Sequence, residues 1–279
     1  MLRGSIRPYI VLVVLWCGLG APRYALAAVI KPDSSSVLTD QHSTSDENFD
    51  CSYAYLDKCG RDLFLWRTDL NDTKAPLTEQ ELHDHCQLQD AAEKCVRRRG
   101  DTCLSGLARG MSKLLLEAIR DDFEPRCDPA TPEHATYLRL APCLNELSDE
   151  FRECSIQFIM STESASSDSV GKSFRQKVPR ACCNFATYTD CMYSSAHKCG
   201  ADGERFMQNM VGKMADDIVT LGCSESYQTN STACAEFRHK GSSKTEAQRL
   251  DREAYDGDYK GIRTFISALA ILAESLTSR

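Results

Sequence analysis

The spacing of the cysteines constrains the fold of this chain more than any other feature. Two quartets share the same gaps of 8, 7 and 23 residues, and they are Cys86, Cys95, Cys103 and Cys127, and Cys182, Cys191, Cys199 and Cys223. A further pair precedes each quartet by 26 or 27 residues, and these pairs are Cys51 with Cys59 and Cys143 with Cys154. Repetition of several independent gaps predicts a tandem duplication. The two copies are then expected to share one disulfide pattern.

The number of cysteines indicates the compartment. The chain has 15, and Cys17 lies in a segment with a basic start, an apolar run over residues 9–19 and small residues before Ala27. This pattern predicts a secretory signal peptide that is cleaved after Ala27. An even number of cysteines then remains in an oxidising environment, which favours seven disulfides. Zinc binding is disfavoured because no two cysteines have the spacing of a CxxC pair.

Two cysteines fall outside the repeated frame. Cys183 forms a doublet with Cys182, and Cys234 follows the second quartet. These two can pair with each other. A shifted frame, with its copies running from Cys59 to Cys143 and from Cys154 to Cys234, leaves Cys51 over in place of Cys234. Six cysteines allow 15 connectivities, so the spacing assigns no bridge within a copy.

Apolar residues between the cysteines recur at helical intervals of three and four. In the first copy they are Leu104, Leu107, Met111, Leu114, Leu115, Ala118 and Ile119, and in the second Phe206, Met207, Met210, Val211, Met214 and Ile218. This period is typical of amphipathic helices, and no comparable stretch alternates at period two. We therefore expect an all-α fold of two tandem disulfide-rich helical repeats, with a flexible N-terminal segment and a C-terminal tail.

Composition divides the chain into five segments. They are a signal peptide (1–27), a disordered linker (28–50), a first cysteine-framed helical repeat (51–142), a second repeat (143–234), and a polar linker with a C-terminal amphipathic helix (235–279). The linker before residue 51 has too little apolar content to fold alone. Serines gather from Ser161 to Ser173, which predicts a mobile loop inside the second repeat.

The mature protein is expected to be an acidic glycoprotein. Loss of three arginines with the signal peptide changes the formal charge from -7 to -10. An acidic surface disfavours nucleic acid and anionic membrane surfaces as partners. Sequons at Asn71 and Asn230 predict two glycosylation sites. No membrane span is expected in the mature chain.

With this frame laid out, the chain resembles the 27 kDa hemolymph glycoprotein family of insects and other arthropods. The resemblance covers about Cys51 to Cys223, and it rests on the two quartets and on the pair of Cys143 and Cys154. It implies a secreted, acidic protein with two cysteine-framed helical segments in tandem. The doublet at Cys183, the serine-rich segment and the 45 residues after Cys234 depart from the family pattern. The biochemical function of that family is unassigned, so the resemblance implies no mechanism.

Two sequence patterns are candidates for a catalytic or a metal site. The doublet at Cys182 followed by Asp190 and Cys191 resembles part of the secreted phospholipase A2 signature, but the histidine that would activate water is missing. His83 and His85 flank an aspartate, yet residues two apart point to different sides of a helix, so we expect a solvated helix end. We expect no catalytic residues, no cofactor and no metal.

The remaining motifs concern binding. Arg99, Gly100 and Asp101 spell the integrin-recognition tripeptide, which a helical conformation would keep out of a ligand groove. Met207, Met210 and Met214 line one helix face, and flexible thioethers suit pockets for irregular apolar ligands. We therefore expect a secreted, non-enzymatic extracellular-fluid glycoprotein that binds or carries a small apolar ligand or an extracellular protein. The alternative is a cell-surface or receptor-type interaction module, comparable to growth-factor co-receptor domains of the GDNF type.

Overall fold

The structure is a computed structural model, and it describes residues 49–68, 74–167, 171–223, 227, 231–237 and 263–277. All of these residues belong to one compact unit that spans residues 46–279. The predicted signal peptide (1–27), the linker up to residue 48, and both sequon asparagines, Asn71 and Asn230, lie outside the described residues.

Helices make up the regular structure of the described residues, which contain no strand, and this confirms the all-α prediction. The helices are α1 (Tyr53–Gly60), α2 (Glu79–Cys103), α3 (Gly106–Cys127), α4 (Pro132–Glu146), α5 (Ser148–Ser167), α6 (Phe174–Ala196), α7 (Gly200–Gly222) and α9 (Phe265–Thr277), with short 3-10 helices η1 (His197–Cys199) and η2 (Thr232–Phe237). The predicted boundary at residues 142/143 falls inside α4, and the one at 234/235 inside η2.

Local sequence signals explain several helix starts. Thr78 caps α2 in a capping box with Glu81, so two otherwise unpaired backbone amides at the helix start have acceptors. Thr131 accepts a hydrogen bond from the His134 amide, and Pro132 follows as the first residue of α4, a position where its missing N–H costs nothing. Gly200 has a φ of 79° between η1 and α7, a left-handed conformation that favours glycine.

The serine-rich segment is not the predicted mobile loop over its first half. Residues 161–167 continue α5, and Ser161 and Ser166 are buried. Their hydroxyls donate to the carbonyl oxygens of Phe158 and Thr162 in the preceding turn. Serine satisfies its own side chain in this way, so a serine cluster does not by itself end a helix.

All fourteen cysteines after Cys17 form disulfides. In the first half the pairs are Cys51–Cys103, Cys59–Cys95 and Cys86–Cys127, and in the second Cys143–Cys199, Cys154–Cys191 and Cys182–Cys223. Corresponding cysteines are joined in both halves, which confirms the prediction of one shared pattern. The two remaining cysteines form the bridge Cys183–Cys234, as the first of the two frames proposed.

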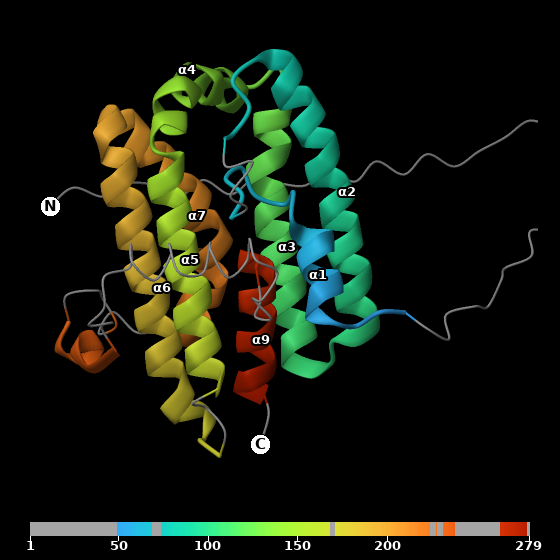
Figure 1. The fold of residues 1–279 in the computed structure, drawn as a ribbon, viewed down its shortest axis with the longest axis vertical. Helices are drawn as coiled ribbons and strands as arrows, with labels where there is room; N and C mark the ends of the chain where they lie inside the picture. Colours follow the sequence, from blue (N-terminus) through green and yellow to red (C-terminus); the bar gives the residue numbers. More distant parts are fainter. Residues whose placement is uncertain are drawn as a thin grey trace, which may run out of the picture. The chain divides into compact units, whose positions relative to one another are not determined.

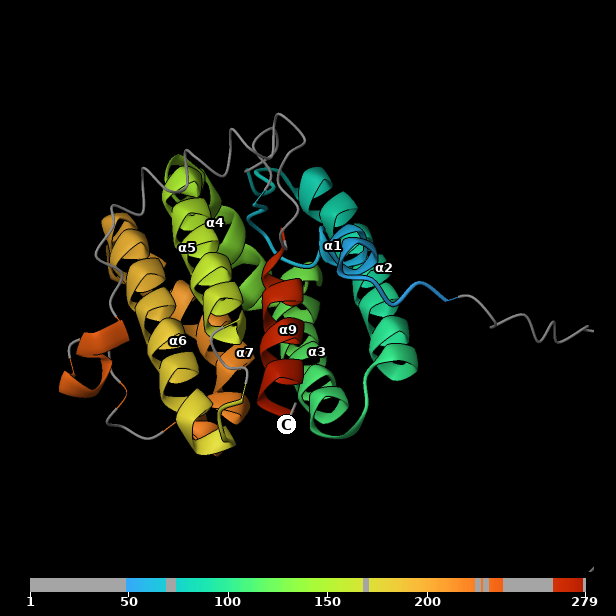
Figure 2. The same cartoon turned by 60° about the horizontal axis from the view of Figure 1, so that its bottom comes forward.

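Helix α9 joins the two halves. It packs against α1 and α3 from the first half and against α5 and α6 from the second. Figures 1 and 2 show it between α5 and α3 in both views. Helices α3 and α7, which follow the third cysteine of each quartet, also pack against each other. The core therefore runs continuously from one half into the other beside α9.

Candidate functional site: a central cavity beside the inner loop

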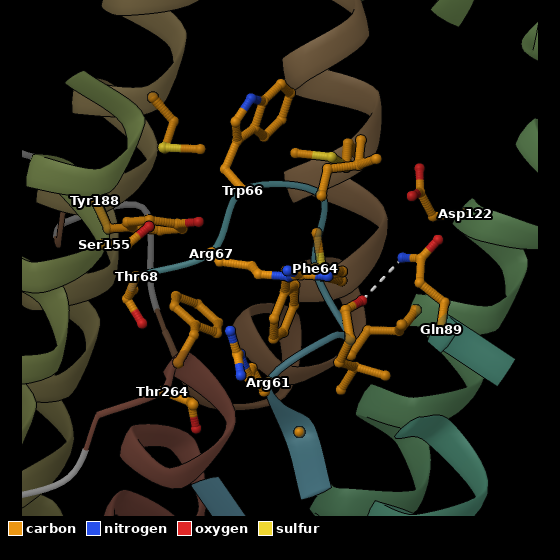
Figure 3. A pocket seen from close by; sticks show the side chains of 18 of the residues that line it. Arg61, Phe64, Trp66, Arg67, Thr68, Gln89, Asp122, Ser155, Tyr188 and Thr264 are labelled. Carbon is orange, nitrogen blue, oxygen red and sulfur yellow. Dashed lines mark hydrogen bonds between the residues drawn. The ribbon is translucent and has the colours of Figure 1, made fainter. Parts of the chain in front are cut away.

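The segment after α1, Arg61–Thr68, turns into the interior, and we call it the inner loop. A cavity of about 40 Å³ lies beside it and is also lined by α2, α3, α5, α6, α7 and α9; we call this the central cavity. Figure 3 shows the inner loop passing between Tyr188 and Ser155 on one side and Gln89 and Asp122 on the other. This position places side chains from both halves around one space.

A polar network fixes the first-half side of the cavity. Gln89 is buried, and its side-chain amide donates to the Leu63 carbonyl oxygen at 3.0 Å. Its oxygen accepts from Arg126 at 3.3 Å, and Arg126 also pairs with Asp122 at 2.5 Å. Buried polar groups that are hydrogen-bonded in this way hold a loop in one conformation. The inner loop is thus tied to α2 and α3.

Cationic side chains near this network affect the His85 imidazole, although Arg126 and Arg67 are themselves paired with Asp122 and Asp62. Burial, together with the nearby charges of Arg126 and Arg67, lowers the pKa of the His85 imidazole to about 3. His85 is buried, which corrects the prediction of a solvated helix end, whereas His83 is exposed on another side of α2. The imidazole therefore stays neutral at neutral pH and adds no charge to the three arginines that line the cavity.

Aromatic side chains form the opposite part of the wall. Trp66 packs on Phe151 with ring centroids 4.6 Å apart, and its indole nitrogen is buried without a hydrogen-bond partner. Phe64 meets Phe265 of α9 at 5.2 Å. Burial raises the pKa of Tyr188, which therefore stays neutral. These aromatic groups are uncharged, and they lie beside polar lining residues such as Ser155 and Thr264.

The structure divides the predicted methionine face. Met210 and Met214 line the central cavity, whereas Met207 is fully buried in the core and does not border it. The predicted face therefore meets a cavity at two of its three positions. The loop that forms the other wall was not predicted. Its residues 63–66 are an apolar run, but their position depends on contacts with distant segments of the chain.

The size of the cavity limits what it holds in this conformation. A volume of about 10–15 Å³ is enough for one water molecule, whereas benzene occupies an apolar cavity of about 150 Å³. The central cavity, at about 40 Å³, accommodates a few water-sized groups. A larger ligand needs displacement of the methionines or of the inner loop.

Other predicted motifs lie elsewhere. Arg99, Gly100 and Asp101 belong to helix α2, and Arg99 and Gly100 are buried, so this conformation does not present the tripeptide to a receptor. Among the described residues, no group of three or more histidine, cysteine or acidic side chains is placed to hold a metal ion. Within the same residues, no helix combines the length and apolar character needed to cross a membrane.

Comparisons with known proteins give no relative. No protein-family model matches the chain, and no curated protein or solved structure matches it either.

Proposed function

We propose that this chain is a secreted, non-enzymatic glycoprotein of extracellular fluid, of the hemolymph type, that binds or carries a small apolar ligand. The observation that carries the proposal is the central cavity, which lies between the two halves and is lined by Met210 and Met214. Unbranched thioether side chains adapt to ligands of irregular shape. Concave sites between helices of a bundle are common ligand sites.

The disulfides support the extracellular setting. Seven bridges form and persist in oxidising compartments and are rare in the cytosol. Each contributes typically about 2–4 kcal/mol by restricting the unfolded chain, which suits a protein exposed to extracellular proteases. The identical pairing in the two halves also supports an origin by internal duplication, as the cysteine spacing predicts.

Binding of a neutral fluorescent apolar compound, N-phenyl-1-naphthylamine, tests the proposal. We expect saturable binding at micromolar concentration to the purified secreted protein. Met210→Trp should weaken it about tenfold or more, because the larger ring occupies the space beside the inner loop. Met214→Phe, at a half-buried position, gives a second variant with less risk to folding.

Met160→Trp provides the matched control, since Met160 lies on α5 and does not line the central cavity. Circular dichroism of each variant shows whether its fold is retained. If the neutral compound does not bind, or if folded Met210→Trp and Met214→Phe bind it as wild type does, the central cavity is not a ligand site.

The small size of the cavity favours one alternative in that event. A rigid cavity of about 40 Å³ would leave the protein as a cell-surface or receptor-type interaction module, in which the disulfides hold an outer surface for a protein partner. Chemical crosslinking in its own fluid would then show a protein partner with no bound small molecule.

A further inference from the structure

A second cavity lies along α9, among α1, α2 and α3. It has a volume of about 60 Å³ and is lined by residues of α1, α2, α3 and α9 and by Leu104; we call it the apolar pocket. Its wall includes Val96, Ala108, Met111 and Leu269. Arg99 is the only charged residue of this wall. Apart from Arg99 and Ser112 the wall is apolar, and a charge is costly to bury there without a partner.

The Arg99 guanidinium is buried, with a relative exposure of 3%. One nitrogen, Nη2, donates to the Cys51 carbonyl oxygen at 2.9 Å, and the group stacks over the Tyr53 ring at 5.5 Å. The other two nitrogens, Nε and Nη1, are buried with no hydrogen-bond partner. Each unsatisfied buried donor destabilises the fold, and more so when the group is charged.

The acids nearest in sequence or contact do not neutralise Arg99. Asp101 pairs with Lys113 at 3.0 Å, and the Tyr53 hydroxyl donates a hydrogen bond to Glu274 at 2.6 Å. Burial and that hydrogen bond raise the pKa of Tyr53, so the phenol stays neutral. Asp50 is exposed and accepts from the Ser52 amide. The hydrogen bonds with Ser52 and, to a lesser extent, the charge of Arg99 lower the pKa of Asp50, but no ion pair joins the two side chains. The described residues therefore leave this cation without an ion pair.

We infer that the apolar pocket binds a small amphipathic monocarboxylate, whose acid group pairs with Arg99 and whose chain lies along Ala108, Met111 and Leu269. A carboxylate supplies both the negative charge and the acceptor oxygens that Nε and Nη1 lack. The wall offers the chain apolar contacts from three helices. Benzene occupies an apolar cavity of about 150 Å³, so the pocket, at about 60 Å³, takes the acid group and the first carbons of the chain. The rest of the chain must displace the half-buried, flexible side chain of Met111. This site is separate from the central cavity of the proposed function and does not depend on it.

Hexanoate and its neutral isostere hexanamide test the inference on the full chain. Methionine methyl groups labelled with carbon-13 separate the two sites by NMR, because Met111 lines the apolar pocket whereas Met210 and Met214 line the central cavity. We expect hexanoate to shift the Met111 methyl resonance in a saturable manner at millimolar concentration. The affinity for hexanamide should be lower by about tenfold or more, because the hydrogen bond between charged groups is lost.

Three variants locate the effect. Arg99→Met keeps side-chain length without charge and should abolish the preference for hexanoate over hexanamide. Arg98→Met, the same change at the exposed neighbouring position, should preserve it. Ala108→Leu fills the pocket without altering the charge and should weaken both compounds.

Three results would each overturn the inference. They are no shift of Met111 with hexanoate, equal affinity for hexanoate and hexanamide, and an unchanged preference in Arg99→Met. If Arg99→Met does not fold, the inference is tested by two other results. They are the affinities of wild type for the two compounds and the effect of Ala108→Leu on both. Failure at Met111 leaves binding at Met210 and Met214 untouched, so this test and that of the central cavity fail independently.

Discussion

At the scale of single residues, the buried face of α2 is unusual because polar groups occupy it. His85, Gln89 and Glu93 are buried there between Leu82 and Val96, and Arg99 is buried just after Val96. Glu93 satisfies itself by pairing with Arg97 of its own helix and with Arg120 of α3. His85 has no such partner at its Nε2 atom. His85 therefore has an unpaired polar atom on this face, and its titration can be tested by mutation.

Burial of neutral His85 predicts that the protein becomes less stable as the pH is lowered. The unfolded imidazole binds a proton below its ordinary pKa of 6.5, whereas the folded one stays neutral until about pH 3. In this window the unfolded state holds more protons, so the free energy of unfolding decreases as pH falls. Each pH unit corresponds to at most about 1.4 kcal/mol. Relative to His85→Gln, wild type should lose about 2 kcal/mol between pH 7 and pH 5.

Guanidinium unfolding with the disulfides intact, at both pH values, measures the difference. His83→Gln, at an exposed position of the same helix, is the control and should retain the pH dependence of wild type. An equal loss in wild type and His85→Gln would show that another group carries the effect.

At the scale of elements, α9 is held at both ends and packed closely in between. The Asp57 carboxylate accepts from the backbone amides of Arg263 and Thr264, and Lys177 donates to the Ser275 carbonyl oxygen. A Cβ atom at Gly60 of α1 would lie 2.2 Å from the Cγ2 atom of Ile266. Such a distance is far below van der Waals contact, so α9 docks on α1 because position 60 has no side chain.

Gly60→Ala should therefore destabilise the protein by about 1–3 kcal/mol, the usual range for overpacking a core. Ile266→Ala alone should cost about 2–5 kcal/mol through the cavity that it leaves. The double variant should cost less than the sum, because the alanine at 266 removes the clash. Chemical denaturation of the four proteins gives the coupling free energy.

Gly110→Ala is the matched control for this cycle. Gly110 is exposed on α3 and its Cβ would meet no other atom, so alanine should be neutral or stabilising there by up to about 1 kcal/mol. Strictly additive costs for Gly60→Ala and Ile266→Ala would show that α9 does not dock as described.

At the scale of the whole molecule, six of the seven bridges form three matching pairs, with one member of each pair in each half. The seventh, Cys183–Cys234, ties η2 to α6 and has no counterpart in the first half. In the described residues, the main neighbour of η2 among the helices is α6. This bridge therefore holds a peripheral segment rather than the core.

Replacing Cys183 and Cys234 together by alanine should leave the other six bridges and the helical content intact. The cost should stay near the usual range of about 2–4 kcal/mol for one disulfide. Non-reducing peptide mapping and far-UV circular dichroism measure the two properties. The comparison variant replaces Cys182, the neighbour of Cys183, together with Cys223. It removes the bridge between α6 and the end of α7. Scrambled pairing in the first variant would contradict this assignment.

The sequence predicted what depends on local spacing. The gaps between cysteines and the apolar period of residues such as Leu115 and Val211 gave the helices and the shared pairing pattern. The same period, extended from Leu82 to Val96, would also have placed Gln89 and Glu93 on the buried face, but polar residues there conceal the stripe from a search for apolar residues. The inner loop and the contact between Gly60 and Ile266 were beyond prediction, because they depend on contacts between distant segments.

The place of α9 has a consequence for the order of events during biosynthesis. Tyr53 of α1 and Glu274 of α9, which share a hydrogen bond, are 221 positions apart in the chain. Both halves leave the ribosome before the helix that fits between them. Until then the apolar faces of α1, α3 and α5 that receive α9 have no cover, which is the condition under which nascent chains aggregate or need chaperones. Each half can oxidise as it emerges, but the joint core closes only after translation has passed residue 277.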